Sequence, residues 1–397
     1  MQTPFSPLQD IQIVDLSTVY SGPLAATMLA DQGAQVIKVE SLEGDTSRMI
    51  GPAKGDLSAT YIAANRGKRS LAMDLKQSAA KAILLQLITK ADVLINNFRP
   101  GVMDRLGLSD AVLVQTNPRL IRLSITGFGS QGEAAQEKVY DAVIQAVAGV
   151  AATQRNPING QPTVLATALC DKLTALNASQ AVVAALYARE KDGQGRRIEI
   201  SMLDATLAFQ WPDAMYNHTF MEQAPPLFPE FGVNQKPWAT QDGLVATMSP
   251  QQAEFRGQCQ ALDRPDIADD PRFASLPLRN HNGKELRQLM EPLMASFTTD
   301  ELLERFHRFN VPIGRINERA EVLLDPHVVQ SQSLVEIEHG DIGRVRQAQH
   351  AALYDGQRLP LPKPAAHLGE HSSDILSELG FSAHEIQALL EQKIIKV

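Results

Sequence analysis

Short apolar runs alternate with longer amphipathic stretches through the first half of the chain. The runs rich in β-branched residues predict strands at 11–17, 35–40, 92–98 and 119–129. A helix is predicted over 78–91, and another follows the first strand, where Pro23 suits the first helical turn and Gly33 suits a C-terminal stop. Strands and helices that alternate in this way predict a parallel sheet with helices on both faces.

Three segments come directly after predicted strands and carry polar or small residues. They are VYSG (19–22), NFRP (97–100) and TGFG (126–129). Because ligands of open α/β sheets bind at the carboxyl ends of the strands, we expect these loops to lie at one ligand-binding edge.

The composition changes after residue 222, where QAPPLFPEFGVNQKPW is rich in proline and aromatic residues. We interpret 223–240 as a linker, with a large domain over 1–222, a smaller domain over 241–320 and a return to the large domain over 321–397. The predicted fold class is α/β: a large doubly wound, Rossmann-like domain made from both chain ends, with a smaller α+β domain. Ser382 and Glu385 form a predicted capping box near the C-terminus.

Composition and charge narrow the possible functions. The 397 residues are 44% hydrophobic and 21% charged, with no run long enough to span a bilayer and no secretory start, so a cytoplasmic protein without a membrane partner is expected. A formal net charge of -8 argues against a nucleic-acid partner. Two cysteines, Cys170 and Cys259, are too few for a disulfide framework or a four-thiolate metal site. Cys170 beside Asp171 is a conceivable catalytic thiol, but its apolar neighbours favour a core position.

Several well-known sequence motifs are missing. The first strand is followed by STVYSGPLAA rather than G-x-G-x-x-G, which argues against a nicotinamide or flavin cofactor. There is also no P-loop, no G-x-S-x-G and no H-E-x-x-H motif. Dehydrogenase, hydrolase and metalloprotease functions therefore lose their usual support.

Asp171 stands just ahead of a long run of Ala, Leu and Val. Aspartate is a good N-cap, because its carboxylate accepts a hydrogen bond from a free N–H of the first turn. Alternatively, it is a nucleophile aimed at a substrate from a helix start, where the positive end of the helix dipole keeps it ionised. The residues alone leave both interpretations open.

Seven phrases in order resemble the class III CoA-transferase family, which contains formyl-CoA transferase, carnitine CoA-transferase and the α-methylacyl-CoA racemases. The resemblance runs from about Leu8 to Leu390 and is carried by DLSTVYSGPLAATMLADQGAQVIKVE, NRGKRSLAMDLK, ADVLINNFRPGVMDRLGL, NPRLIRLSITGFGSQG, ALCDKLTALNASQAVVAAL, DDPRFASLPLRN and LGEHSSDILSELGF. It implies CoA transfer from an acyl-CoA to a small carboxylic acid, with no metal and no tightly bound cofactor.

The resemblance also implies roles for individual residues. Asp171 falls on the family's catalytic aspartate, which attacks the thioester and then carries CoA as an aspartyl thioester. The phrase KVYDAVIQA is similar to a family segment that flanks the thioester. This similarity implies that Lys138, Tyr140 and Asp141 lie beside the thioester and that Tyr140 and Asp141 are catalytic.

CoA carries phosphates and an adenine, so its site needs cations and a flat apolar slot. The matching segments imply a CoA-binding set made of Val19, Tyr20, Arg66, Lys68, Arg69, Met73, Leu75, Lys76, Asn97, Phe98, Arg99, Met103, Arg105 and Lys138. The alternative for the cations is that they form an ordinary solvated face.

Two departures from the family matter. The racemase branch has a histidine where this chain has Tyr140, so racemisation is the second candidate function. Formyl-CoA transferase has a glycine run that closes over the intermediate, and the corresponding segment PEFGVNQKPWATQDG has none. A non-catalytic acyl-CoA sensor is a third candidate. The resemblance further implies an interlocked homodimer. Arg155 precedes the helix that carries Asp171 and is a candidate partner for a second carboxylate of the acceptor, but an ordinary surface-loop arginine is the favoured interpretation.

Overall fold

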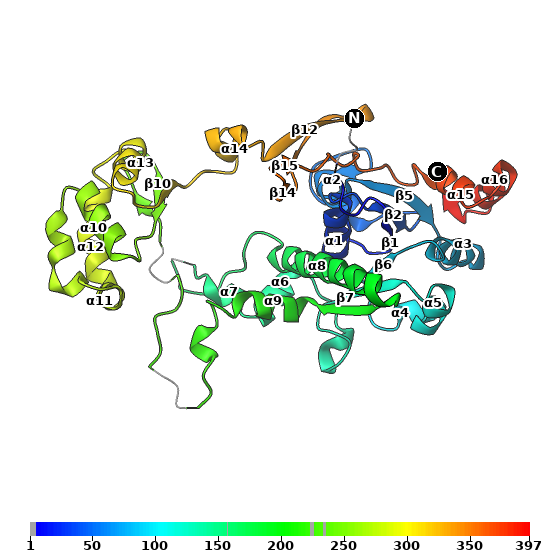
Figure 1. Cartoon of the computed structure of the whole chain (residues 1–397), viewed down its shortest axis with the longest axis horizontal. Helices are drawn as coiled ribbons and strands as arrows, with labels where there is room; N and C mark the ends of the chain where they lie inside the picture. The colour runs from blue at the N-terminus through cyan, green and yellow to red at the C-terminus, as the bar shows by residue number, and fades with distance from the viewer. Residues whose placement is uncertain (1–4, 157, 223–225, 233–235) are drawn as a thin grey trace. The chain divides into compact units, whose positions relative to one another are not determined.

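The computed structural model describes residues 5–156, 158–222, 226–232 and 236–397, drawn in Figure 1. The chain divides into two compact units, one made of Met1–Gln210 with Gln332–Val397 and the other of Trp211–Ser331. Within the predicted linker 223–240, residues 223–225 and 233–235 lie outside the described residues.

A seven-stranded sheet forms the centre of the first unit, in the order β16-β5-β2-β1-β6-β7-β8. Every neighbouring pair is parallel except β16 and β5, which are antiparallel. The strands are β1 Gln12–Asp15, β2 Gln35–Glu40, β5 Lys68–Met73, β6 Val93–Asn96, β7 Ile121–Thr126, β8 Arg197–Ser201 and β16 Ile395–Lys396. The prediction of a mainly parallel α/β sheet is confirmed.

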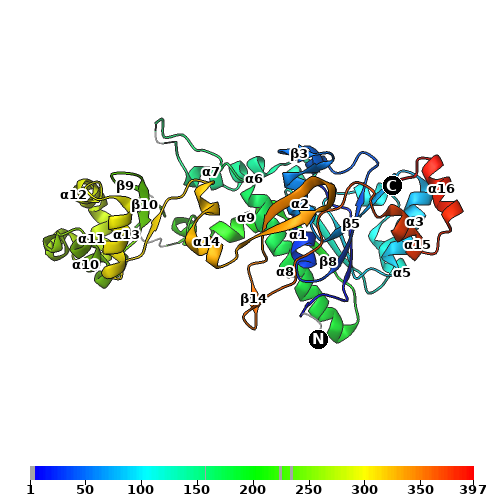
Figure 2. The same ribbon diagram turned by 90° about the horizontal axis from the view of Figure 1, so that it is seen from above.

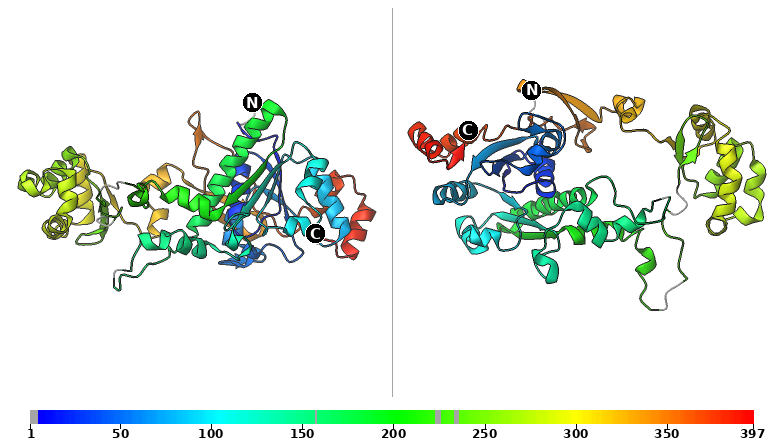
Figure 3. Two further views of the ribbon diagram at one scale, coloured as in Figure 1. Left: turned by 90° about the horizontal axis from the view of Figure 1, so that it is seen from below. Right: turned by 180° about the vertical axis from the view of Figure 1, so that it is seen from behind.

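Helices cover both faces of this sheet because its inner strands are apolar on both sides. In β1, Ile13 faces a core shared with α1, α6, α8 and α9, whereas Val14 faces a second core shared with α3, α5, α15 and α16. Figure 2 shows α8 on one side of β5 and the helices α3, α15 and α16 on the other. Figure 3 shows the same separation between the green helix α8 and the red C-terminal helices.

The helix expected after the first strand and the helix expected over 78–91 are present in the first unit, as Ser21–Ala30 and Ser78–Ile88. The α-helices of this unit are α1 Ser21–Ala30, α2 Ala59–Asn65, α3 Ser78–Ile88, α4 Val102–Arg105, α5 Asp110–Thr116, α6 Asp141–Val147, α7 Val150–Thr153, α8 Leu169–Asp192, α9 Met202–Gln210, α15 Ser372–Glu378 and α16 Ala383–Glu391. The predicted capping box is confirmed, because Ser382 and Glu385 exchange hydrogen bonds at the start of α16. No helix among the described residues is both long and apolar enough to cross a membrane.

Three short hairpins complete the first unit. They are β3 Ala53–Lys54 with β4 Leu57–Ser58, β12 Leu334–His339 with β13 Gly343–Ala348, and β14 Leu353–Tyr354 with β15 Gln357–Arg358. After these hairpins the chain returns to the sheet, where Ile395 pairs with Met73 of β5.

The second unit combines a small antiparallel sheet with helices. Its strands are β9 Trp238–Ala239, β10 Leu244–Thr247 and β11 Ile313–Arg315, and its helices are α10 Gln252–Ala261, α11 Leu276–His281, α12 Gly283–Met294, α13 Thr299–Arg308 and α14 Pro326–Gln330. Phe255, Phe273 and Phe306 are buried in a core of its own. A separate core is what an independently packed unit requires.

Candidate active site

Loops that follow three neighbouring strands surround one cavity of about 340 Å³ in the first unit. The lining includes 18–21 after β1, 97–100 after β6, and 125–127 at the end of β7. The wall also includes 137–140, Asp171, Thr46, Ala135 and Met202. The three loops singled out in the sequence therefore meet at the carboxyl edge of the sheet.

Asp171 is the third residue of α8 and does not cap that helix. The N-cap is Ala168, and no side chain of the cap residue bonds the first turn. Instead, the Asp171 backbone N–H donates to Oδ1 of Asp141 at 2.9 Å. The prediction that Asp171 is a cap is wrong, because Asp141 supplies the acceptor for this first-turn N–H. The Asp171 side chain is left to face the cavity.

Burial raises the pKa of Asp171 to about 6, and the nearby charge of Asp141 acts in the same direction. Ser21 opposes this rise, since its hydroxyl donates a hydrogen bond to Oδ1 of Asp171. The expectation of an ionised carboxylate holds at neutral pH, although desolvation outweighs the favourable contacts and raises the pKa. A carboxylate with a pKa of about 6 is ionised at neutral pH and more basic than an exposed aspartate.

Asp141 and Tyr140 stand at the start of α6. Tyr140 occupies the N-cap position with its side chain 72% exposed, whereas Asp141 is buried. Oδ2 of Asp141 accepts a hydrogen bond of 2.5 Å from Gln145, and Gln145 Oε1 accepts the Leu165 N–H at 2.8 Å. Gln145 thus ties Asp141 to the segment before α8. Sequence reasoning missed Gln145, although its place one turn after Asp141 is the spacing at which helical side chains meet.

Part of the predicted CoA-binding set lies together on the cavity wall, namely Val19, Tyr20, Asn97, Phe98, Arg99 and Lys138. Asn97 has a structural task as well, because its amide accepts the Thr18 N–H at 2.9 Å and donates to the Thr18 carbonyl at 2.7 Å. Arg99 and Lys138 are exposed and form no ion pair within the described part of the chain.

The basic cluster Arg66, Lys68 and Arg69 is absent from that wall. Arg66 pairs with Asp31 at 2.6 Å, and Arg69 pairs with Glu378 at 2.8 Å. Lys68 is buried, and its ammonium donates three hydrogen bonds of 2.8 to 2.9 Å to Asp15, the Pro23 carbonyl and Asn65.

These pairings correct the expectation for Lys68. An ammonium has three donors, so none is left for a phosphate. Burial also lowers the pKa of Lys68 to about 8, although the Asp15 charge opposes the change. The sequence pattern resembles a charged face, but Arg66 caps the end of α2 and Lys68 and Arg69 begin strand β5, and each of the three side chains pairs with a carboxylate of the same unit.

The other predicted CoA contacts also lie away from the cavity lining. Met73 is buried in β5, and Leu75 and Met103 pack against the same core. Lys76 and Arg105 are exposed, and neither forms an ion pair with a described residue. Cys170 is fully buried, and burial raises its pKa to about 11, which supports the core position over the thiol nucleophile. The described residues contain no group of three or more potential metal ligands from His, Cys, Asp and Glu.

Comparison with known proteins identifies the family. The model of CoA-transferase family III matches residues 8–372. This chain belongs to CoA-transferase family III. The acetyl-CoA:oxalate CoA-transferase of Acetobacter aceti is 35% identical to this CoA-transferase over 84% of the chain and 86% of its own length. The succinyl-CoA:glutarate CoA-transferase of Homo sapiens is 32% identical over 94% of the chain and 86% of its own length.

Solved structures agree with this assignment. The crystal structure of Rv3272 from Mycobacterium tuberculosis matches the CoA-transferase with a TM-score of 0.84 and 29% identity, over 94% of this chain and 100% of that chain. A CAIB/BAIF family protein from Brucella suis matches with a TM-score of 0.81 and 30% identity, over 94% and 99% of the two chains. The central, mostly parallel sheet is therefore common to this chain and its structural relatives.

Proposed function

We propose that this enzyme transfers CoA from an acyl-CoA donor to a carboxylic acid through a covalent intermediate on Asp171. The observation that carries the proposal is the placement of a partly buried carboxylate, with a pKa of about 6, on the cavity wall at the carboxyl edge of the sheet. Its raised pKa makes it a better nucleophile than an exposed aspartate, and it is still ionised at neutral pH.

The proposed reaction uses two reversible exchanges at this carboxylate. Asp171 attacks the thioester carbonyl of the donor, forming a mixed anhydride and releasing the CoA thiolate. The thiolate then attacks the aspartyl carbon, which forms an aspartyl-CoA thioester and releases the donor acid. An incoming carboxylate attacks that thioester, and the thiolate finally attacks the new acyl carbon. Atoms and charge balance at each step with no further reactant.

Asp141 supports this chemistry as a positioning residue. Its 2.9 Å contact with the Asp171 N–H fixes the first turn of α8, and its negative charge keeps the neighbouring carboxylate basic. Tyr140 is exposed at the cavity wall, where its ring and hydroxyl can contact a bound thioester. Lys138 adds a positive charge at the same wall.

We propose that the cations without internal partners bind the CoA phosphates. Among the predicted cations, those that form no ion pair with described residues are Lys76, Arg99, Arg105 and Lys138. An arginine without an internal partner offers planar, bidentate donors to phosphate, and no existing ion pair has to break before the phosphate binds. Arg99 and Lys138 both line the cavity, and of these two only the arginine offers bidentate donors, so Arg99 is the strongest candidate of the four.

Replacing Arg99 with alanine is expected to raise the KM for acyl-CoA about ten-fold, because a lost charge-assisted contact costs about 1.5 to 3 kcal/mol. Steady-state kinetics with intact acyl-CoA and with an acyl-pantetheine lacking the nucleotide measure the effect. Arg99→Ala and the wild type should differ only with the intact substrate. Lys90→Ala, an exposed cation after α3, is the matched control. A loss of kcat at unchanged KM would place Arg99 elsewhere in the site.

We propose a small dicarboxylic acid as the acceptor, because the names of the relatives above pair their CoA donors with oxalate or glutarate. Arg155 is exposed, donates to the Gly160 carbonyl at 3.0 Å and is absent from the cavity lining, which gives no support to its role as the carboxylate partner. Lys138 is exposed on the wall of the same cavity as Asp171, and with Arg99 assigned to the CoA phosphates it is the cation there that suits a second carboxylate.

We also propose a cytoplasmic homodimer with interlocked chains, in which 223–240 acts as a linker. Support comes from α8, where Leu176, Val183 and Tyr187 are 55%, 39% and 66% exposed. Their spacing of seven and four residues places them on one helix face, and an exposed apolar face of this kind is typical of a subunit interface. Sedimentation at micromolar concentration is expected to give a dimer, and a monomer would contradict this proposal.

Chemical trapping tests the covalent mechanism directly. Enzyme incubated with acetyl-CoA or succinyl-CoA alone and treated with hydroxylamine or borohydride should yield a modified peptide containing Asp171, measured by mass spectrometry. Addition of oxalate or glutarate before trapping should discharge the intermediate and produce the new acyl-CoA. A purely binding protein would show neither a modified peptide nor exchange of labelled carboxylate into acyl-CoA.

A further inference from the structure

We propose that Ser21 is a further catalytic residue, whose hydroxyl stabilises the negative charge that forms on Oδ1 of Asp171 during CoA transfer. This inference rests on the proposed function, since it concerns charge on the aspartyl group. Nothing in the resemblance singled out Ser21, which reaches Asp171 across 150 positions of sequence.

Ser21 contacts the Asp171 carboxylate in two ways. Its hydroxyl donates a hydrogen bond to Oδ1, and its backbone N–H provides a second contact that also lowers the pKa of the carboxylate. Ser21 is buried at the first position of α1, and its hydroxyl also lies 4.0 Å from the sulfur of Met202. In this water-poor setting a hydrogen bond to a charged oxygen is strong. We therefore assign Oδ2 as the attacking oxygen and Oδ1 as the oxygen held by the protein.

The chemistry puts charge on Oδ1 in two of the steps. When the CoA thiolate attacks Cγ of the anhydride, the carbonyl electron pair moves onto Oδ1, which becomes an oxyanion until the donor carboxylate leaves. The incoming carboxylate creates the same tetrahedral arrangement when it displaces the thiolate. Ser21 keeps its proton throughout and donates a hydrogen bond that strengthens as the charge grows. This is the action of an oxyanion hole donor.

The loop that presents Ser21 is fixed at three consecutive residues, 17–19. Lys38 donates to the Ser17 carbonyl at 2.8 Å, and Asn97 clamps both polar groups of Thr18. The Val19 N–H donates to both oxygens of Asp45 at 3.1 and 3.2 Å. A carboxylate, an ammonium and an amide thus hold the backbone just before Ser21, so the hydroxyl is pre-organised.

Val19 adopts a backbone conformation that valine rarely accepts, with φ at +69°. Such strain persists only where the surroundings hold it, and it concentrates at functional positions. Asp45 provides the hold, because it is buried and forms a 2.9 Å ion pair with Lys38. Gly22 is needed next to this loop, since a Cβ there would lie 2.3 Å from the Cβ of Ser17.

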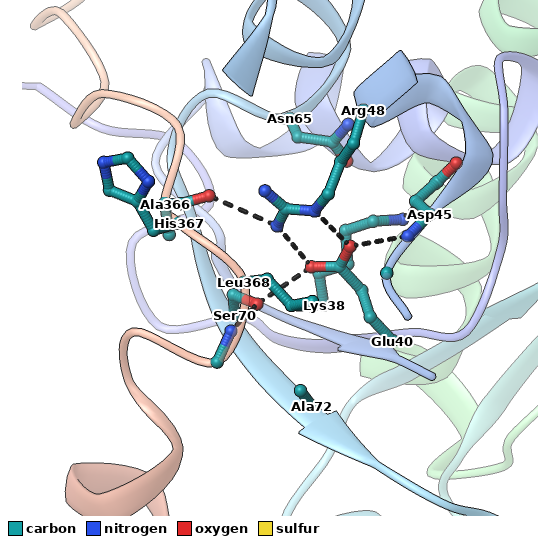
Figure 4. A network of polar contacts seen from close by, with 12 residues as sticks. Lys38, Glu40, Asp45, Arg48, Asn65, Ser70, Ala72, Ala366, His367 and Leu368 are labelled. Carbon is teal, nitrogen blue, oxygen red and sulfur yellow. Dashed lines mark hydrogen bonds and ion pairs between the residues drawn. The ribbon is translucent and has the colours of Figure 1, made fainter. Parts of the chain in front are cut away.

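A second layer of contacts fixes Asp45 itself. The Asp45 backbone N–H donates to Glu40 at 3.0 Å, and Glu40 is held in turn by Arg48 and Ser70, as Figure 4 shows. The backbone of Val19 is therefore held by buried side chains of β2, of β5 and of the segment that follows β2. Such a support is what precise placement of a catalytic hydroxyl requires.

Replacing Ser21 with alanine tests the proposal. We expect kcat to fall roughly 10- to 100-fold, because one hydrogen bond to a charged oxygen is lost, while the KM for acyl-CoA changes less than about two-fold. The acid limb of the pH–rate profile should move to higher pH, since the hydroxyl normally lowers the pKa of Asp171. The matched control is Ser377→Ala, an exposed serine of α15, which should behave like the wild type.

The outcomes separate this proposal from the proposed function. Unchanged kcat and an unchanged acid limb in Ser21→Ala, together with an inactive Asp171→Asn variant, would overturn the role of Ser21 and leave the mechanism standing. Full activity in Asp171→Asn would instead overturn the mechanism. A purely structural role for Ser21 predicts a lower unfolding temperature with kcat per folded enzyme and pH profile intact.

A double-mutant cycle tests the support from Asp45. Asp45→Asn should lower kcat in the wild-type background and should add little in the Ser21→Ala background, because both changes remove the same placed hydroxyl. Equal losses in the two backgrounds would show that Asp45 acts independently of Ser21. Circular dichroism on each variant restricts the comparison to folded protein.

Discussion

Replacing Asp171 with asparagine is expected to abolish CoA transfer, because an amide cannot attack a thioester to form the anhydride. The variant should also give no trapped peptide after incubation with acyl-CoA. The measurement is conversion of acyl-CoA and a dicarboxylic acid to the new acyl-CoA, followed by mass detection. In the wild-type enzyme the rate should fall as the pH drops through about 6, where burial places the pKa of the carboxyl and protonation removes the nucleophile.

Stability provides the control for this variant. The pKa of Asp171 is about 6 in the folded protein, against 3.8 for an unperturbed aspartate, so ionisation of the carboxylate costs stability that grows from about pH 4 to pH 6 and stays constant above it. The asparagine variant has no such cost. Its free energy of unfolding should exceed that of the wild type by up to about 3 kcal/mol at pH 8, with a smaller gap at pH 4. Denaturant unfolding at the two pH values measures this.

Two results would contradict the role assigned to Asp171. One is full transfer activity in a folded asparagine variant, with no modified peptide in the wild type. The other is a ternary-complex rate law, which would mean that both substrates must be bound before any bond breaks. A folded, more stable and inactive variant is the combination that the geometry supports.

The parts of the fold that the sequence predicts are those in which local pattern and tertiary structure agree. β1, β2, β6 and β7 are short apolar runs because both sheet faces are buried, and this pattern is visible without the structure. Strand β5 was missed because it begins with Lys68 and Arg69, which resemble an exposed cluster. Only the partners Asp15 and Glu378, distant along the chain, reveal why charged residues begin a strand there.

The candidate site shows the same limit. The loops 19–22, 97–100 and 126–129 could be placed at one edge, because every parallel strand ends there. The contacts within the site could not be predicted. Asp141 accepts the hydrogen bond from the first turn of α8, and the hydroxyl that donates to Asp171 belongs to Ser21. Residues joined across 30 and 150 positions leave no local pattern. The sequence signal available for Ser21 was its place in the loop after the first strand, immediately before Gly22.

Behind the site, a buried arginine joins three parts of the first unit. Arg48 donates to both oxygens of Glu40 at 2.8 and 2.7 Å and to Asp56 at 2.8 Å. It also donates to the carbonyl of Ala366 at 3.3 Å, in the segment that returns to the sheet, as drawn in Figure 4. Glu40 and Arg48 are both almost fully buried. Each charge therefore depends on the other.

Replacing Arg48 with methionine is expected to lower the free energy of unfolding by about 3 to 5 kcal/mol, because buried Glu40 loses the cation that contacts both of its oxygens and keeps only the nearby charge of Lys38. Arg48 contributes to the lowered pKa of Glu40, so its removal lets the carboxyl take a proton more readily. The loss should be largest at neutral pH and should shrink as the pH falls below about 4.5, where glutamate is neutral in the unfolded chain as well.

Urea unfolding of Arg48→Met, followed by circular dichroism at pH 7 and pH 4, measures this loss. The matched control is Arg69→Met, which breaks an ion pair whose side chains are 30% and 61% exposed and should cost at most about 1 kcal/mol. The double variant Arg48→Met with Glu40→Gln should recover part of the loss, because it removes the stranded charge as well. Equal costs for Arg48→Met and Arg69→Met would mean that burial gives the Glu40–Arg48 pair no special weight, and that Asp45, and with it the loop carrying Ser21, is anchored by other contacts.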